Sequence, residues 1–350
     1  MSHINSSPLA NLAKQVTDRK QDHIDAVLND PLVERNTQGF ENIRLMHRAL
    51  PECDFANIDT TTTFLGKSIR FPFLIASMTG GASQNLGDIN RHLAEAAQAC
   101  NVPMAVGSQR AMIVDEAAKQ SFAIRKFAPD VPLIANLGAV QLNYGFGVDE
   151  ARRAIDVLQA DALYLHLNPL QEVIQPEGDT NFARLAEKIH LLAEQIDVPI
   201  ILKEVGSGLS PQDIELGLAA GITLFDLAGR GGTSWSRIEA HRSDNDLGIL
   251  FQDWGLTTVE SLRLSEPYQE KAQFIASGGI RNGIDMIKAV IMGGRLCGVA
   301  APLLAPAQES TEQVVARIEQ FKQEFQTAQF LLGIKDIDAL HLNTALIAPL

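Results

Sequence analysis

The sequence is poor in cysteine, in positive charge and in long apolar runs, and each shortage excludes a class of protein. Its three cysteines, Cys53, Cys100 and Cys297, are scattered and form no CxxC pair, which argues against a disulfide framework or a zinc site. No apolar stretch approaches the roughly 18 residues that span a bilayer, and the N-terminus lacks the basic start and apolar core of a signal peptide. We therefore expect a cytoplasmic protein with no membrane partner.

The charge balance of the chain excludes a further class of binding partner. The 350 residues include 29 Lys and Arg against 42 Asp and Glu, which gives a formal net charge of −13. Nucleic acid repels a chain of this charge, so we expect no nucleic-acid partner. An anionic substrate would require basic residues that are gathered locally against this background.

Eight short apolar runs predict the fold. Most are continuous, as expected of strands buried on both faces, and they cover residues 73–77, 103–107, 132–137, 162–167, 199–205, 223–228, 272–277 and 296–300. Helical patterns between them cover residues 85–100, 149–158, 181–195, 211–220 and 283–292. This alternation predicts parallel strands with right-handed crossovers. A doubly wound sheet accounts for about six such units, so eight favour a closed α/β barrel of the (β/α)₈ TIM-barrel class.

Three segments make up the predicted organisation. Residues 1–70 form an N-terminal arm with one short helix after Asp18, residues 71–310 form the barrel, and residues 311–350 form a C-terminal helix and tail that pack on it. A polar insertion, residues 231–254, follows the sixth strand. Because loops after the strands build the active site in this fold, the residues that follow each run are the candidates.

The loops after the seventh and eighth runs predict a phosphate site. Gly278, Gly279 and Arg281 follow the seventh run and open a helix, and Ala300 and Ala301 follow the eighth. Loops at these two places, with a helix N-terminus, form the usual phosphate site of such barrels. Glycine gives the ligand access to the backbone, and Arg281 adds a forked donor.

The loop after the fourth run carries a dense polar cluster of His166, Asn168, Gln171 and Glu172. Glu172 is a candidate ligand for Mg²⁺, since hard cations bind carboxylate and phosphate oxygens. His166 has the alternative of a satisfied core histidine. Lys203 ends the fifth run, where a lysine is costly to bury without an anionic partner. It could form a Schiff base, contact a flavin or reach out to solvent.

Three other strand ends each allow two interpretations. Met78 and Thr79 precede paired glycines and either admit a ligand or form a plain turn. Ser108 and Arg110 either bind an oxyanion or belong to a solvated loop. Asn136 either contacts a planar heterocycle or satisfies backbone groups.

Two further places depend on local charge and backbone donors. Thr233 follows glycines whose N–H groups suit an anion or a flavin edge. Arg19 and Lys20 occupy the first turn of the predicted arm helix, where positive charge opposes the helix dipole. Such a misfit is expected at an anion site, and solvated charge is the alternative.

Several of these motifs stand in the order of a known family. They are Arg19-Lys20-x-Asp22-His23-Ile24, Met78-Thr79-Gly80-Gly81, Gly107-Ser108-Gln109-Arg110, His166-Leu167-Asn168-Pro169-Leu170-Gln171-Glu172, Lys203-Glu204-Val205-Gly206, Gly231-Gly232-Thr233-Ser234-Trp235 and Asp253-Trp254-Gly255. Across residues 18–304 the chain resembles the type 2 isopentenyl-diphosphate isomerases, which are FMN-dependent barrel enzymes of isoprenoid synthesis. One departure is Arg230, where that family has a small residue.

The resemblance implies a role for each matching residue. It assigns the flavin ring and ribityl chain to Ser77, Met78, Thr79, Ser108, Asn136, Lys203 and Thr233, and the FMN phosphate to Gly279, Arg281, Ala300 and Ala301. It assigns the isoprenyl diphosphate substrate to Arg19, Lys20, Ser108, Arg110, His166, Asn168 and Gln171. It assigns Mg²⁺ to Glu172, and catalysis to Gln171, Lys203 and His166.

The resemblance also implies the reaction, a 1,3-proton transfer that interconverts isopentenyl and dimethylallyl diphosphate. In that family reduced FMN is thought to be the acid and base, through its N5 and N1–C2=O region. Mg²⁺ would bind the diphosphate, NADPH would reduce the flavin, and Lys203 would stabilise the anionic reduced form. A homo-oligomer, tetrameric or octameric, is implied as well.

Two other functions compete with this interpretation. An FMN-dependent 2-hydroxy-acid oxidase or dehydrogenase carries His-Gly-Gly-Arg after the sixth strand, whereas this chain has Arg230-Gly231-Gly232-Thr233. A flavin-binding sensor or store without catalysis would need neither the Arg19-Lys20 pair nor Glu172.

Overall fold

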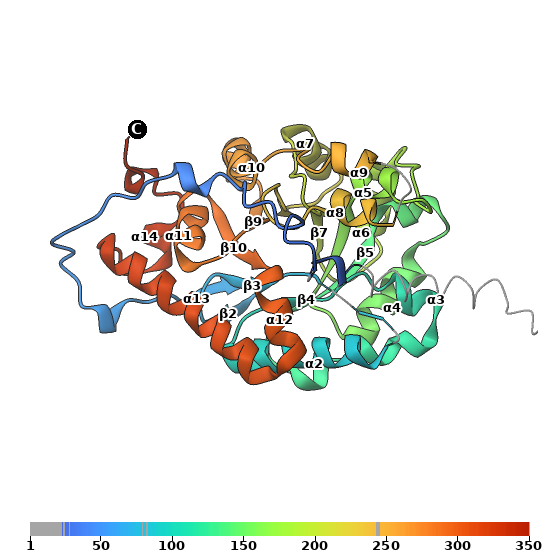
Figure 1. Cartoon of the computed structure of the whole chain (residues 1–350), viewed down its shortest axis with the longest axis horizontal. Helices are drawn as coiled ribbons and strands as arrows, with labels where there is room; N and C mark the ends of the chain where they lie inside the picture. The colour runs from blue at the N-terminus through green and yellow to red at the C-terminus, as the bar shows by residue number, and fades with distance from the viewer. Residues whose placement is uncertain are drawn as a thin grey trace, which may run out of the picture.

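The computed structural model describes residues 23, 25–27, 29–78, 80, 81, 83–242 and 246–349. Its centre is a closed barrel of parallel strands in the order β10-β3-β4-β5-β6-β7-β8-β9 (Figure 1). The strands are β3 (Phe73–Ile75), β4 (Met104–Ala105), β5 (Leu133–Gly138), β6 (Ala162–Leu167), β7 (Ile200–Glu204), β8 (Leu224–Asp226), β9 (Gln273–Ser277) and β10 (Gly294–Val299). Each lies at one of the eight predicted runs, and the predicted TIM-barrel class is confirmed.

Helices surround the barrel. Those at the predicted places are α2 (Gln84–Cys100), α4 (Val148–Leu158), α6 (Leu185–Ala193), α7 (Pro211–Ala219) and α11 (Gly283–Ile291). The others are α3 (Arg110–Val114), α5 (Pro169–Ile174), α8 (Trp235–Ala240), α9 (Leu247–Leu250), α10 (Thr258–Ser265), α12 (Ala301–Glu309), α13 (Thr311–Leu331) and α14 (Ile337–Leu340). The start predicted for α6 is early, because Arg184 is left-handed at φ 57° and residues before it cannot continue the helix. The insertion after β8 contains α8 and α9.

A hairpin that the sequence patterns did not reveal closes one end of the barrel. It consists of β1 (Thr62–Phe64) and β2 (Lys67–Ile69), which pair antiparallel. Phe64 and Ile69 are buried against inward-facing strand residues that include Leu74, Ile134 and Ile201. Strands of three residues are too short for an alternating pattern to be recognised, so the sequence predicted only one short helix in the arm and no strands.

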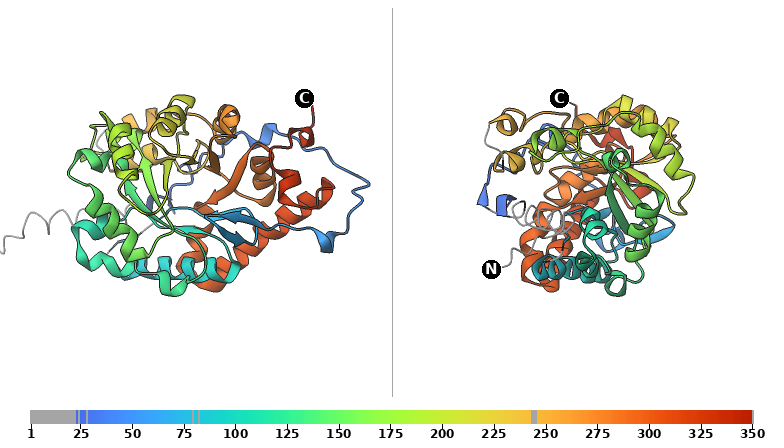
Figure 2. Two further views of the ribbon diagram at one scale, coloured as in Figure 1. Left: turned by 180° about the vertical axis from the view of Figure 1, so that it is seen from behind. Right: turned by 90° about the vertical axis from the view of Figure 1, so that its right-hand side faces the viewer.

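The C-terminal part of the chain packs along one side of the barrel. Helix α13 lies beside α2, α11 and α12, and the ring of Phe321 lies 5.3 Å from that of Phe73 on β3. Segments from opposite ends of the chain run side by side, since Leu45 and Ile347 form a β-bridge (Figure 2). Within the described residues, no helix is long and apolar enough to cross a membrane.

Candidate active site at the carboxyl ends of the strands

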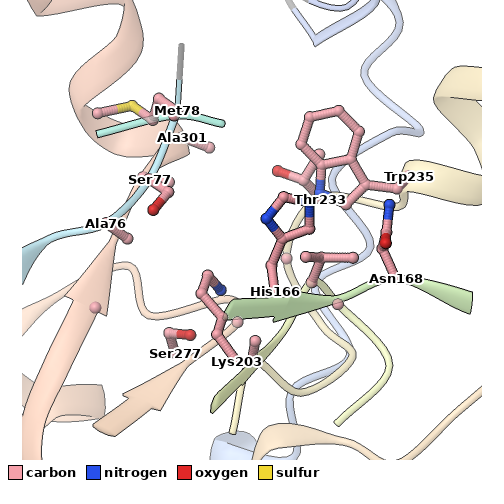
Figure 3. A pocket seen from close by; sticks show the side chains of 18 of the residues that line it. Ala76, Ser77, Met78, His166, Asn168, Lys203, Thr233, Trp235, Ser277 and Ala301 are labelled. Carbon is pink, nitrogen blue, oxygen red and sulfur yellow. The ribbon is translucent and has the colours of Figure 1, made fainter. Parts of the chain in front are cut away.

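One cavity at the mouth of the barrel gathers the predicted site residues that the structure describes (Figure 3). Residues from every strand or the loop after it contribute, as expected for this fold. The predicted residues that line it are Ser77, Met78, Ser108, Arg110, Asn136, His166, Asn168, Gln171, Glu172, Lys203, Thr233, Gly279, Arg281, Ala300 and Ala301. Arg19, Lys20 and Thr79 lie outside the described residues. The individual roles of these residues remain predictions.

Strand register explains why residues far apart in sequence meet on the cavity wall. In the parallel pairs β6–β7 and β7–β8, His166 is opposite Lys203, and Lys203 is opposite Asp226. His166 Nδ1 lies 2.8 Å from Asn136 Oδ1. The Asn136 amide donates to Ser77 Oγ at 3.1 Å and to a backbone carbonyl at 3.0 Å. Asn136 therefore both faces the cavity and satisfies backbone, so its two interpretations are compatible.

The cavity floor contains a buried ion pair. Lys203 is 8% exposed, which rules out the alternative that its ammonium reaches solvent. Its Nζ donates to the carbonyl of Glu204 at 2.8 Å and lies 3.7 Å from Asp226 Oδ2. Asp226 is the anionic partner that burial of this lysine requires, and no local sequence pattern marks it.

The loops after β8 and β9 pack backbone against backbone at the predicted phosphate end. A Cβ on Gly278, whose φ is +101°, would lie 2.0 Å from the Gly229 carbonyl oxygen, and one on Gly232 would lie 2.7 Å from the Gly279 nitrogen. Only glycine permits so close an approach.

The donors at this end suit a phosphate group. Helix α12 begins after Ala300 without a side-chain cap, so its N-terminal N–H groups favour an anion. The Arg281 guanidinium donates to the Gly279 carbonyl at 2.6 Å and to the Glu34 carboxylate at 2.8 Å. The glycine contacts, the uncapped helix and the arginine together fit the FMN phosphate.

Glu172 is a buried residue in the cavity wall, beside the residues predicted to bind the substrate. Its carboxylate accepts hydrogen bonds from the Asn168 amide at 2.9 Å, from the Gln175 amide at 2.7 Å and from the Asp179 backbone at 2.7 Å. The described residues contain no group of three or more His, Cys, Asp or Glu that could hold a metal. Mg²⁺ commonly uses one or two carboxylates together with substrate phosphates and water, and a single glutamate fits that manner of binding.

A buried glutamate that sequence reasoning missed joins the arm to this wall. Glu239 on α8 is fully buried and accepts from His23 at 3.0 Å, from Gln171 at 2.9 Å and from Arg242 at 2.8 Å. Burial raises the pKa of Glu239, but these hydrogen bonds outweigh it and hold the pKa at about 2. Glu239 lies in the polar insertion after β8, outside the motifs that carry the family resemblance, so no local signal marked it.

Ion pairs hold the described part of the arm over the loops after β8 and β9. Asp30 pairs with Arg237 at 2.6 Å, and Arg35 makes two hydrogen bonds to Asp253. The side chain of Arg230, the departure noted above, donates to Thr37 at 3.0 Å and is absent from the cavity lining. Its side chain therefore forms no part of the wall of the predicted flavin site.

Comparison with known proteins agrees with this geometry. Residues 13–132 and 151–347 match the family described as FMN-dependent dehydrogenase. The isopentenyl-diphosphate delta-isomerase of Hydrogenovibrio crunogenus is 65% identical and covers 95% of this chain and 98% of its own length. That of Paracoccus zeaxanthinifaciens is 56% identical, with coverages of 95% and 97%.

Solved structures share the architecture at low identity. A flavocytochrome b2 mutant superposes with a TM-score of 0.67 at 18% identity, over 97% of this chain and 85% of that one. A mandelate oxidase variant gives 0.62 at 19% identity, over 95% and 96%. At this identity the likeness concerns the fold alone.

Fold, cavity and family match define an α/β-barrel enzyme of the FMN-dependent dehydrogenase class. Within that class, the chain belongs to the isopentenyl-diphosphate delta-isomerase family.

The Glu239 network predicts a distinctive acid response. Because its folded pKa of about 2 lies below the ordinary 4.5, ionised Glu239 stabilises the fold above pH 4.5, and this contribution is lost as pH falls towards 2. We expect Glu239→Gln to lower the unfolding free energy at pH 7 by about 3 kcal/mol, with the gap closing in acid. Urea unfolding from pH 7 to pH 2.5 measures this.

A matched control is Glu177→Gln, since Glu177 is the exposed second partner of Arg242. It should change the unfolding free energy by less than about 1 kcal/mol. Unfolding curves for Glu239→Gln that stay parallel to wild type across the pH range would contradict the assignment.

Proposed function

We propose that the chain interconverts isopentenyl and dimethylallyl diphosphate, with reduced FMN in the cavity and Mg²⁺ on the substrate diphosphate. The observation that best supports this proposal is that one cavity combines a glycine-lined phosphate end, a lysine on its floor and a buried Glu172 on its far wall. FMN binding alone would not call for the last of these. The names of the relatives support the isomerase activity.

The residues divide naturally between cofactor and substrate. The FMN phosphate would lie at Gly279, Arg281, Ala300 and Ala301, and the ring and ribityl chain along Ser77, Met78, Ser108, Asn136, Lys203 and Thr233. The diphosphate would bind near Arg110, with Mg²⁺ at Glu172. The wall formed by His166, Asn168 and Gln171 would face the isoprenyl group.

The chemistry explains why the site needs a flavin. The alkene gains a proton at its terminal carbon and loses one from C2, so the reaction has no net redox change. Since these carbons are poorly matched to side-chain pKa values, reduced FMN would supply the acid and base. The chain's own contribution is to orient the substrate, neutralise the diphosphate and exclude water.

The contacts of Gln171 and Lys203 indicate what each side chain does in the site. Gln171 donates its amide to Glu239 at 2.9 Å, and this bond fixes the orientation of the Gln171 side chain on the wall. The Lys203 ammonium on the cavity floor would stabilise negative charge on the reduced cofactor. NADPH is the proposed physiological reductant.

The oxidase alternative is not supported by the loop after β8. Residues 230–233 offer no histidine as a base, and the curated relatives are named as isomerases. The solved structures of flavocytochrome b2 and mandelate oxidase are similar to this chain in fold alone.

The redox state of FMN provides the direct test of this proposal. Protein loaded with FMN and reduced anaerobically with dithionite should isomerise isopentenyl diphosphate, while the oxidised form should be slower by about 10²–10⁴-fold, the usual contribution of acid–base catalysis. Product is measured by proton NMR. Equal rates from oxidised, reduced and flavin-free protein would reject the proposal.

Glu172 provides a test of the metal. Glu172→Gln keeps the size of the side chain but turns one acceptor oxygen into a donor and removes the charge that attracts Mg²⁺. It should lose Mg²⁺-dependent activity by at least about 10–100-fold, the usual cost of losing even an outer partner of a metal ligand, while retaining FMN. Rates are measured against Mg²⁺ concentration. Glu177→Gln, in the exposed turn just after α5, should behave as wild type, and an unchanged Mg²⁺ requirement in Glu172→Gln would remove Glu172 from the site.

A further inference from the structure

Asp226 is a fully buried carboxylate that the proposed function leaves without a task. It ends β8 with no exposed surface. Its Oδ2 accepts a hydrogen bond from the Tyr164 hydroxyl at 2.8 Å, and its Oδ1 accepts one from the Ser277 hydroxyl. Among the described residues, Lys203 is the cation that pairs with it, with 3.7 Å between Nζ and Oδ2.

The arrangement places Asp226 behind Lys203 as seen from the cavity. Lys203 and Ser277 line the cavity, whereas Asp226 does not. Figure 3 shows the Lys203 side chain with His166 and Ser277 around it. A ligand on the floor would therefore contact the lysine while the aspartate stays beneath, held from two further strands by Tyr164 and Ser277.

The titratable groups that face Lys203 come from the two neighbouring strands, β6 and β8. His166 is its register partner on β6, the Tyr164 ring lies 5.9 Å from Nζ, and Asp226 is its partner on β8. The carboxylate of Glu204 is turned away and accepts from backbone N–H groups of residues 205–207. Asp226 is thus the one carboxylate of this described set that approaches the ammonium.

We propose that Asp226 is a positioning residue, the buried counter-ion that keeps Lys203 protonated and aimed at the bound flavin. This rests on the proposed function, since it assigns Lys203 to the cofactor. Removing one partner of a buried pair leaves an uncompensated charge. Without Asp226 the lysine gives up its proton more readily, and it takes the proton back when the flavin becomes anionic. In a protein without Asp226, the positive charge of Lys203 on the cavity floor would no longer be permanent and would vary with pH.

The holoenzyme test measures proton uptake on reduction. The midpoint potential of bound FMN is followed against pH in wild type and in Asp226→Asn. Asp226→Asn is expected to take up an additional proton, up to one for each flavin reduced, because Lys203 becomes protonated together with reduction. Tyr164→Phe, which keeps both charges, should retain the wild-type dependence. An Asp226→Asn slope equal to that of wild type would overturn the proposal.

A second test uses flavin-free protein, so that a failure of FMN binding is distinguishable from a failure of the counter-ion role. In Asp226→Asn the unpaired lysine should be protonated more fully in the unfolded chain than in the folded one, so stability should rise with pH from about 8 to 10 relative to wild type. Burial raises the pKa of Glu204 to about 7, and the charge of Lys203 lowers it, so this titration differs between the variants. Because it makes stability fall as pH rises, its sign is opposite to that of the rise expected from the lysine.

The double variant Lys203→Met/Asp226→Asn distinguishes loss of the ion pair from a general destabilisation of the fold by the substitution. Replacing both partners removes the unpaired charge, so the double variant should lack the alkaline rise and be more stable than Asp226→Asn at pH 7. This comparison holds even if Asp226→Asn alone fails to fold, because the double variant should then restore folding. A double variant no more stable than Asp226→Asn, or an alkaline rise that persists without Lys203, would contradict the pairing.

Discussion

Closure of eight parallel strands into one barrel is the constraint on which the rest of this structure depends. Because all the strands run in the same direction, their carboxyl ends meet at one mouth, and residues separated by many tens of positions become neighbours there. The register then decides which side chains share a level. His166, Lys203 and Asp226 are successive partners across β6, β7 and β8, and the short hairpin of β1 and β2 seals the other end.

The basic side chains of the cavity are each neutralised by an acidic partner in this acidic chain. Each of the three described Lys and Arg side chains that line the cavity forms an ion pair with a carboxylate. The pairs are Arg110 with Asp179, Arg281 with Glu34 and Lys203 with Asp226. Their burial differs. Asp226 is fully enclosed, whereas the side chains of Asp179 and Glu34 are 16% and 26% exposed. We therefore expect a ligand phosphate to replace the two half-buried acids at the arginines, while the lysine on the floor keeps its partner.

The sequence predicted what depends on local pattern and missed what depends on tertiary contact. Continuous apolar runs predicted the eight strands, and glycines followed by Arg281 predicted a phosphate site where two backbones do meet closely. The hairpin was missed because three-residue strands carry too little periodicity. Asp226 and Glu239 were missed because nothing near them in sequence is unusual, and only folding brings Lys203 or His23 against them. The cost of burying Lys203 did predict an anion, but not which residue supplies it.

We propose that the cavity at the barrel mouth holds FMN by its phosphate at the loops after β9 and β10. The most direct measurement is the equilibrium affinity of flavin-free protein for FMN and for riboflavin, which lacks the phosphate, in wild type and in Arg281→Met. We predict that wild type binds FMN more tightly than riboflavin, and that Arg281→Met weakens FMN binding by about tenfold or more while leaving riboflavin affinity unchanged. Equal affinity of the wild-type protein for both flavins would contradict the account.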